Sequence, residues 1–314
     1  MPYRGGALLD QNAIKTRRTP YLRVVPQKEA YELEGFSFNQ RAQGQSALEE
    51  LESLVGLEKV KDLIYEVYAF AEVQKKREKI GLASDKVVLH MIFKGNPGTG
   101  KTTIARILGK LLRNAGILEK GHVVEVERAD LVGEYIGHTA QRTREQIRKA
   151  QGGILFIDEA YSLCRGGEKD FGKECVDCIV KGMEDYAKET VFILAGYPAE
   201  MEEFLRSNPG LRSRFPIHLE FPDYSVSELT QIAELMLRKR EYRLSQDAVD
   251  LLEDIIREKK AQEIVPSNAR MVRNLIEKAI RRQAVRLVRD RAFTRHDLMM
   301  LTARELLEAS ISLV

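Results

Sequence analysis

The feature that most constrains this chain is a glycine-rich loop, Gly95-Asn96-Pro97-Gly98-Thr99-Gly100-Lys101-Thr102, which has the pattern G-x-x-x-x-G-K-T. An apolar run over residues 87–93 precedes the loop, as a buried strand would, and apolar residues at helical spacing follow it over 103–112. In a strand–loop–helix unit, consecutive backbone N–H groups can surround a phosphate at the N-terminus of the helix. The loop therefore predicts a binding site for a nucleoside triphosphate.

Two side chains of this loop have predicted roles of their own. Lys101 can reach the β- and γ-phosphates, and the Thr102 hydroxyl can ligate Mg²⁺. The other residues expected to bind ATP are Gly95, Asn96, Pro97, Gly98, Thr99, Gly100 and Thr103. A glycine-rich turn that matches the pattern by accident is the alternative, and the flanking strand and helix patterns argue against it.

A second apolar segment, residues 153–157, ends in two adjacent carboxylates, Asp158 and Glu159. A P-loop NTPase needs an acidic residue at the end of a neighbouring strand to hold Mg²⁺, and Asp158 is suited to that role. Glu159 can then polarise the water that attacks the γ-phosphate. Apolar strands that end in Asp-Glu are also common where a strand runs into a solvated loop, so the interpretation depends on the glycine loop upstream.

The order of apolar patterns predicts two folded domains after a polar N-terminal arm. Short apolar segments at 87–93, 123–126, 154–157, 191–195 and 217–221 alternate with helical ones, which predicts a five-stranded parallel sheet between helices. From residue 225 the pattern is only helical, with helices near 225–242, 245–260, 269–288 and 304–313. We expect a disordered arm over 1–45, an α/β ATPase domain over 46–223 and a small all-α lid domain over 224–314.

Charge and hydropathy limit the classes of partner. The chain has 50 basic and 47 acidic residues among 314, a net charge of +3 that does not call for a nucleic-acid partner. Arginines recur between Arg281 and Arg295, but such runs usually form a solvated or intersubunit helix face, and no DNA-binding motif accompanies them. No segment approaches the roughly 20 apolar residues of a membrane span, and no signal peptide is recognised. We expect a cytoplasmic protein with no membrane partner.

Together these motifs resemble the AAA+ ATPases, and three segments are similar to one branch of that family. The segments are 96–100, 131–139 and 267–274, and the branch contains the stage V sporulation protein K family and the red-type Rubisco activases. The resemblance runs from about Ser46 to the C-terminus. It implies an Mg²⁺-dependent ATPase that forms a homo-hexameric ring and remodels an unidentified protein client. A sporulation-associated role is favoured over a Rubisco activase role, and an ATPase acting on nucleic acid is a third reading.

The same resemblance implies further ATP-site residues. Arg214 resembles an arginine finger, with Arg212 as second choice, because a planar, permanently charged guanidinium can neutralise charge on a neighbouring subunit's γ-phosphate. The alternative for Arg214 is an ion pair with a surface carboxylate. Arg270 matches the sensor-2 arginine that contacts the bound phosphates, whereas Arg273 is expected to face solvent. Gly56 belongs to the segment that packs around the adenine.

Two aromatic residues have open interpretations. Tyr135, Ile136 and Gly137 resemble a pore loop that grips a threaded peptide. A lone tripeptide of this kind would more often belong to a core, but its position after the second predicted strand favours the pore loop. Tyr197 follows the fourth predicted strand, where the family usually has a polar sensor-1 residue that orients the attacking water. Either the Tyr197 hydroxyl substitutes for that residue or the role is absent.

Overall fold

The structure is a computed structural model that describes residues 38–83, 88–135, 137–165, 171–262, 266–290 and 293–311, with side chains from residue 45 onward. The chain separates into two units, Met1–Ser37 and Phe38–Val314, and only the second is described. Most of the predicted arm therefore lies outside the described residues. Helix α1 (Phe38–Glu52) begins ahead of Ser46, where the sequence pattern places the first helix.

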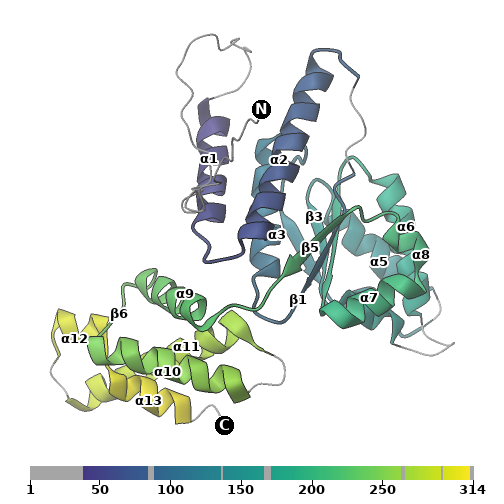
Figure 1. The fold of residues 1–314 in the computed structure, drawn as a ribbon. Helices are drawn as coiled ribbons and strands as arrows, with labels where there is room; N and C mark the ends of the chain where they lie inside the picture. The colour runs from purple at the N-terminus through teal and green to yellow at the C-terminus, as the bar shows by residue number, and fades with distance from the viewer. Residues whose placement is uncertain are drawn as a thin grey trace, which may run out of the picture. The chain divides into compact units, whose positions relative to one another are not determined.

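A five-stranded parallel sheet forms the centre of the α/β domain, with the strand order β2-β3-β4-β1-β5 (Figure 1). The strands are β1 (Met91–Gly95), β2 (Val123–Val126), β3 (Ile154–Ile157), β4 (Val191–Gly196) and β5 (Ile217–Phe221). Because β4 lies between β1 and β3, the loops after these three strands meet at one edge of the sheet, where open α/β sheets bind their ligands.

Strand β1 differs from its predicted position. Sheet pairing begins at Met91, which lies opposite Ile193 of β4 and Ile217 of β5, and it continues to Gly95. Just before Met91, Leu89 and His90 are buried without joining the ladder, whereas Val88 is exposed, because hydropathy does not report backbone pairing. In the sequence, the charged Lys94 indicated that the strand ends at residue 93. It is buried within β1 and forms an ion pair with Glu202.

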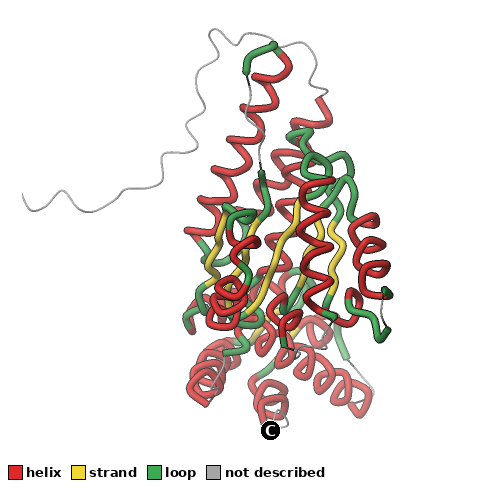
Figure 2. Tube along the Cα trace, turned by 90° about the vertical axis from the view of Figure 1, so that its right-hand side faces the viewer, coloured by secondary structure: helices red, strands yellow, loops and turns green. Residues whose placement is uncertain are grey.

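Helices cover both faces of the sheet, as Figure 2 shows for the yellow strands between red helices. Helices α1, α2 (Glu58–Lys79) and α3 (Lys101–Asn114) pack on the face that carries Phe93. Helices α5 (His138–Lys149), α6 (Gly172–Asp185) and α7 (Pro198–Ser207) cover the opposite face, which carries Ile92. Neighbouring residues of a strand point to opposite faces, so these two side chains belong to different cores. The short elements α4 (Arg128–Leu131), the 3₁₀-helix η1 (Ala160–Cys164) and α8 (Pro209–Arg212) lie in the connections.

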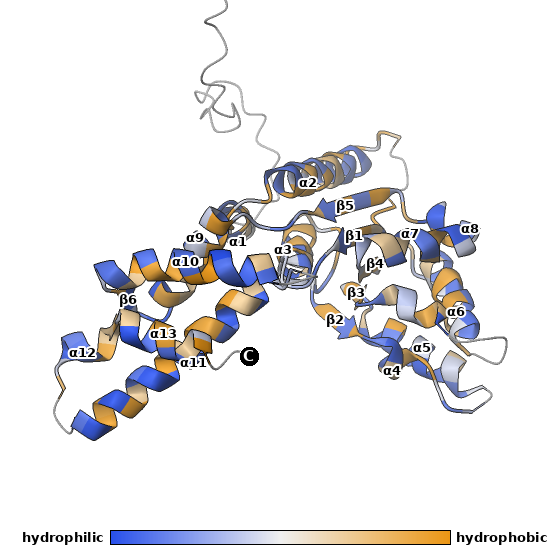
Figure 3. Ribbon diagram, turned by 60° about the horizontal axis from the view of Figure 1, so that its bottom comes forward, coloured by the Kyte–Doolittle hydropathy of each residue, from blue (hydrophilic) through white to orange (hydrophobic). Residues whose placement is uncertain are grey.

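The lid is a small helical domain with its own apolar core. Its helices are α9 (Val226–Arg238), α10 (Gln246–Gln262), α11 (Asn268–Asp290), α12 (Arg295–Met299) and α13 (Ala303–Ile311). Apolar bands, orange in Figure 3, run along α10, α11 and α13, and they bury Leu252, Leu275 and Leu306 completely. Two short strands, β6 (Arg243–Leu244) and β7 (Met300–Leu301), pair in parallel. Within the described residues, no helix is both long and apolar enough to cross a membrane.

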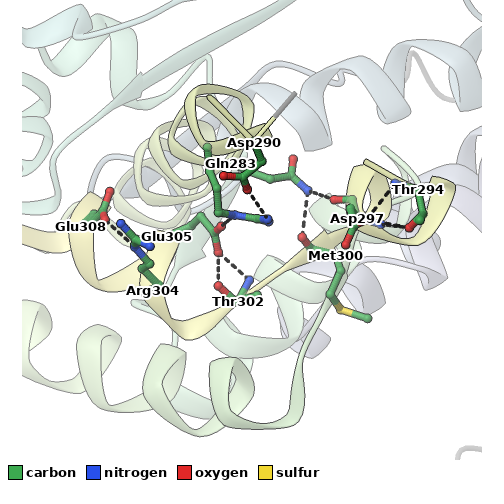
Figure 4. A network of polar contacts seen from close by, with 10 residues as sticks. Gln283, Asp290, Thr294, Asp297, Met300, Thr302, Arg304, Glu305 and Glu308 are labelled. Carbon is green, nitrogen blue, oxygen red and sulfur yellow. Dashed lines mark hydrogen bonds and ion pairs between the residues drawn. The ribbon is translucent and has the colours of Figure 1, made fainter. Parts of the chain in front are cut away.

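A network of polar contacts fastens the C-terminal part of the lid to α11 (Figure 4). The Gln283 amide, which is buried, donates to the carbonyl oxygens of Asp297 and Met300 at 2.8 Å each. Arg286 Nε donates to Glu305 Oε1 at 2.5 Å, and the Thr302 N–H donates to Glu305 Oε2 at 2.8 Å. Burial raises the pKa of Glu305, but these bonds outweigh it and hold the pKa below its ordinary value. Helix α11 is thus anchored to α12, β7 and α13.

Candidate nucleotide-binding site

A cavity of about 410 Å³ opens between the α/β domain and the lid. Its walls come from the glycine loop after β1, the ends of β3 and β4, the segment before α2, and helices α9 and α11. Predicted site residues in its lining are Pro97, Gly98, Gly100, Lys101, Thr102, Thr103, Asp158, Glu159 and Arg270. Residues that are up to 173 positions apart (270 minus 97) are therefore brought to one cavity.

The glycine loop has the backbone that its pattern predicts. Gly98 and Gly100 have φ angles of 71° and 98°, in the left-handed region that favours glycine. A Cβ atom on Gly98 would lie 2.3 Å from the carbonyl oxygen of Ser267, so no other residue fits there without a shift of backbone. Helix α3 begins at Lys101, directly after the loop. The loop and the helix N-terminus form a cradle that fits an anionic phosphate.

Lys101 lies at the centre of this cradle. Its Nζ donates to the carbonyl oxygens of Gly95 and Asn96 at 2.7 and 2.9 Å. Burial lowers the pKa of Lys101, and the Asp158 carboxylate opposes that shift. A partly buried ammonium gains stability from nearby negative charge, so this arrangement favours an anionic ligand.

Asp158 and Glu159 both line the cavity at the end of β3. Glu159 has a φ of 46°, a left-handed conformation that is uncommon for a residue other than glycine, and its N–H donates to Asp158 Oδ1 at 3.0 Å. Residues held in such conformations cluster at functional sites. Mg²⁺ prefers oxygen ligands, which Thr102, in the first turn of α3, and Asp158, directly after β3, can supply to the same cavity. The donor set therefore fits a nucleotide with its metal ion.

Part of the lining of the cavity is apolar, as an adenine ring requires. The apolar residues in its lining are Leu54, Val55, Leu57, Ile232, Leu235 and Met236. Gly56, which was predicted to pack around the adenine, is not in the lining. It has a φ of 62°, and a Cβ atom there would lie 2.2 Å from Glu228 Oε1, so it permits the turn that brings Val55 and Leu57 to the cavity.

Three members of the predicted loop point elsewhere. Thr99 is fully buried, and its hydroxyl donates to the carbonyl of Asn96 at 2.8 Å. The Asn96 amide contacts Asp223, and Gly95 takes part through its carbonyl oxygen. Their contribution to the site is therefore to hold the loop.

Two lid residues and one hinge residue extend the site beyond the sequence prediction. Arg273 is exposed, as expected, and it also lines the cavity together with Arg270, because both lie near the start of α11. Tyr224 also lines the cavity, and its hydroxyl donates to the carbonyl of Thr99 at 3.2 Å. Lys239 of the lid adds another positive charge. Tyr224 belongs to no recognisable sequence motif. It lies at the start of the lid and meets the glycine loop only in the folded chain.

Tyr197 lines the cavity beside Gly196 at the end of β4. Its ring stacks on Tyr161 with 5.9 Å between centroids and an interplanar angle of 28°. The Tyr161 hydroxyl is buried and has no hydrogen-bond partner among the described residues. Burial, followed by the charge of Glu159, raises the pKa of Tyr161 to about 12, so the phenol stays protonated. Tyr161 was not predicted as a site residue, and its ring packs against that of Tyr197.

The two candidate finger arginines lie outside this cavity. Arg214 Nη2 donates to Glu184 Oε1 at 2.5 Å, and its Nη1 donates to the carbonyl of Gly210 at 2.9 Å. Arg212 lies on α8 and is exposed. Neither side chain belongs to the lining of the cavity in its own chain.

The described residues of the predicted pore loop, Tyr135 and Gly137, are at the surface. Tyr135 is 65% exposed, and its ring meets His138 edge-on with centroids 5.4 Å apart, so Tyr135 is not a core residue. Gly137 has a φ of 83° and precedes α5. Ile136 lies outside the described residues.

Similarity to known proteins covers both domains. The chain matches the family described as "ATPase family associated with various cellular activities (AAA)" over residues 91–223 and "AAA lid domain" over 225–311. Stage V sporulation protein K of Bacillus subtilis (strain 168) is 56% identical over 259 residues, which cover 82% of this chain and 80% of that protein. Protein CbbX of Cereibacter sphaeroides is 48% identical over 242 residues, 76% and 78% of the two chains. The crystal structure of the FIGL-1 AAA domain shares the fold, with a TM-score of 0.57 at 18% identity over 91% of this chain and 92% of that one.

Proposed function

This chain belongs to the AAA family of ATPases, in the branch that contains stage V sporulation protein K and CbbX, and we propose from this that it is a ring-forming motor that remodels a protein client. One observation supports the proposed ATP hydrolysis. A single cavity joins Lys101, the carboxylates of Asp158 and Glu159, and the lid residue Arg270. Binding, hydrolysis and movement of the lid can therefore be coupled at one site.

In the proposed mechanism, the glycine loop and Lys101 bind the β- and γ-phosphates of ATP. Thr102 and Asp158 would hold Mg²⁺, which neutralises charge on the phosphates when bound. Glu159 accepts a hydrogen bond from a water and orients it toward the γ-phosphate, and as a carboxylate it can take the proton. Arg270 and Arg273 extend from the lid toward the same phosphates, so the position of the lid depends on the nucleotide.

The proposal places the finger on a neighbouring subunit of a homo-hexamer. Arg214 serves as the finger, with Arg212 as the alternative. Support comes from their position, because neither arginine lines the cavity of its own chain. A finger supplied by a neighbour makes hydrolysis depend on assembly.

We assign client contact to the segment of Tyr135, Ile136 and Gly137. The 65% exposure of Tyr135 supports this, because a ring that is free of the core can press against a polypeptide without demanding a sequence. A sporulation-associated role is favoured by the 56% identity to stage V sporulation protein K. A role like that of a red-type Rubisco activase is the second candidate, favoured by the 48% identity to CbbX.

The test is ATP hydrolysis by the purified chain alone, with an unstructured polypeptide and with DNA. The protein-remodelling proposal predicts stimulation by the polypeptide and no response to DNA. A variant with Lys101→Ala serves as the control, since stimulated turnover that survives loss of nucleotide binding would come from a contaminant. Stimulation by DNA alone would overturn the proposal in favour of a nucleic-acid motor.

A further inference from the structure

Two asparagines that have no part in the chemistry above meet at one carboxylate. Asn96 Nδ2 lies 3.0 and 2.9 Å from the two carboxylate oxygens of Asp223, and Asn268 Nδ2 donates to Asp223 Oδ1 at 2.7 Å. Asn96 belongs to the glycine loop, Asp223 to the connection between β5 and α9, and Asn268 begins α11 of the lid. These three residues, which we term the asparagine latch, join the ATPase domain, the hinge and the lid.

Asn268 is the central member of the latch. It is 2% exposed, and its φ of 49° is left-handed, a conformation that asparagine tolerates better than most residues. Its Oδ1 accepts from the Tyr224 N–H at 3.0 Å. Its Nδ2 also lies 3.3 Å from the carbonyl oxygen of Pro97 and 3.1 Å from that of Pro266. Every polar atom of this buried side chain is therefore engaged, across three segments.

The start of α11 also fixes the orientation of the glycine loop. The carbonyl oxygen of Pro97 faces Asn268 Nδ2, and that of Gly98 accepts from the Ala269 N–H at 3.2 Å. In a planar trans peptide, the carbonyl and the following N–H point in opposite directions. These two bonds therefore set the directions of the Gly98 and Thr99 N–H groups, which belong to the phosphate-binding loop.

We propose that Asn268 is a positioning residue, which through the latch holds the glycine loop and the first turn of α11 in one arrangement. Arg270 lies on that turn and Arg273 on the next, so a fixed helix start sets both arginines toward the phosphate end of the cavity. Pre-organisation of this kind raises affinity because less is lost in ordering the groups on binding. The inference rests on the proposed ATP-binding function of the cavity, and it adds the device that ties the lid to the loop.

The first test exchanges the two members of the central pair. Asn268→Asp keeps the shape of the side chain but sets a carboxylate against Asp223 and the carbonyl of Pro97. In the double variant Asp223→Asn/Asn268→Asp, the amide at 223 can donate to the carboxylate at 268 and still accept from Asn96. The net charge of the pair equals that of the wild type, so a general effect of charge on phosphate binding cancels.

The measured quantities are the dissociation constant for a fluorescent ADP analogue and the thermal unfolding midpoint. We expect Asn268→Asp to weaken binding roughly ten-fold or more, as for loss of a buried hydrogen bond to a charged group. The double variant should bind more tightly than the summed effects of Asn268→Asp and Asp223→Asn alone predict, although the contact with Pro97 stays lost. Effects that simply add would overturn the latch, since independent sites, and a general effect of charge on phosphate binding, give additive changes.

The second test separates positioning from folding. Asn268→Gly removes the amide but accepts a φ of 49° without strain, so we expect a folded protein with weakened nucleotide binding. Because the latch acts through Arg270, the change Arg270→Ala should weaken binding less in the Asn268→Gly background than in the wild type. An equal loss in both backgrounds would overturn the latch. Failure of the wild-type chain to bind nucleotide would overturn the proposed function as well, whereas normal binding by Asn268→Gly would overturn the latch alone.

Discussion

Replacing Arg214 with alanine should have a small effect on stability and a large effect on catalysis. Among the described residues, its guanidinium contacts Glu184 at 2.5 Å and the carbonyl of Gly210 at 2.9 Å. The side chains of Arg214 and Glu184 are 35% and 60% exposed, so the pair is a surface ion pair worth about 0–1 kcal/mol. The free energy of unfolding should therefore fall by no more than about 1 kcal/mol, a decrease of roughly 2–4 °C in Tm.

The catalytic effect expected of a finger is far larger. Arginine fingers in other NTPases contribute roughly 10³–10⁵ in rate, which corresponds to about 4–7 kcal/mol of activation free energy. The assay is steady-state ATP hydrolysis, with thermal melting and binding of a fluorescent ADP analogue on the same samples. Arg214→Ala should bind nucleotide normally, melt almost as the wild type does, and lose most turnover.

Two matched variants identify which contact matters. Glu184→Gln removes the ion pair but leaves the guanidinium, so it should retain turnover. Arg212→Ala removes the second candidate finger, which is also exposed, and should retain turnover if Arg214 is the finger. Mixing Arg214→Ala with Lys101→Ala should restore some activity, because at a mixed boundary one subunit supplies the finger and the other the glycine loop. Wild-type turnover by Arg214→Ala, or full activity of a demonstrably monomeric wild-type sample, would refute the reasoning.

Two substitutions test the cavity, and a change of pH tests the core. Lys101→Ala should abolish nucleotide binding, whereas Glu159→Gln should bind ATP normally and hydrolyse it very slowly; wild-type turnover of the latter in a phosphate-release assay would contradict the role of Glu159. His90 is 3% exposed and accepts from the Phe192 N–H at 3.2 Å, and burial lowers its pKa from 6.5 to about 4. The unfolded chain therefore binds a proton that the folded chain excludes, so stability should be full above pH 6.5 and decrease as pH falls toward 4, by up to about 3 kcal/mol. Urea unfolding of wild type and His90→Leu across this range checks it, and parallel pH profiles would contradict it.

The central strands β3 and β4 could be predicted because they are buried on both faces and read as continuous apolar runs, whereas the partly exposed edge strands β2 and β5 read as short, mainly apolar segments interrupted by charged or polar residues. Strands β2, β3 and β5 begin and end at the predicted residues, and β4 extends to Gly196. Strand β1 was displaced because Lys94 is buried through an ion pair that hydropathy cannot reveal. Strands β6 and β7 were not predicted, because a strand of two residues is too short to show an alternating hydropathy pattern.

The predictable part of the site is the part that is contiguous in sequence. The glycine loop and the Asp158-Glu159 strand end are local motifs, and both line the cavity. Three residues were not predicted to belong to the site, because their positions depend on how the lid and η1 pack against the loop and β4. These are Arg273, Tyr224 and Tyr161. The latch shows the same limit. Asn96 and Asn268 stood out as family-like residues, but only the fold reveals that Asp223 joins them.

We propose that this ATPase does mechanical work on a polypeptide, and replacement of Tyr135 is the sharpest probe of that activity. Tyr135 is 65% exposed and does not line the nucleotide cavity, so Tyr135→Ala should leave folding and basal ATP hydrolysis largely intact. The measurement is the stimulation of hydrolysis by a permissive unstructured polypeptide, in wild type and in Tyr135→Ala, with thermal melting to establish that the variant is folded. We expect stimulation to be lost while basal turnover remains, because the variant has lost the aromatic surface that grips the polypeptide. Unchanged stimulation in a well-folded Tyr135→Ala protein would contradict it.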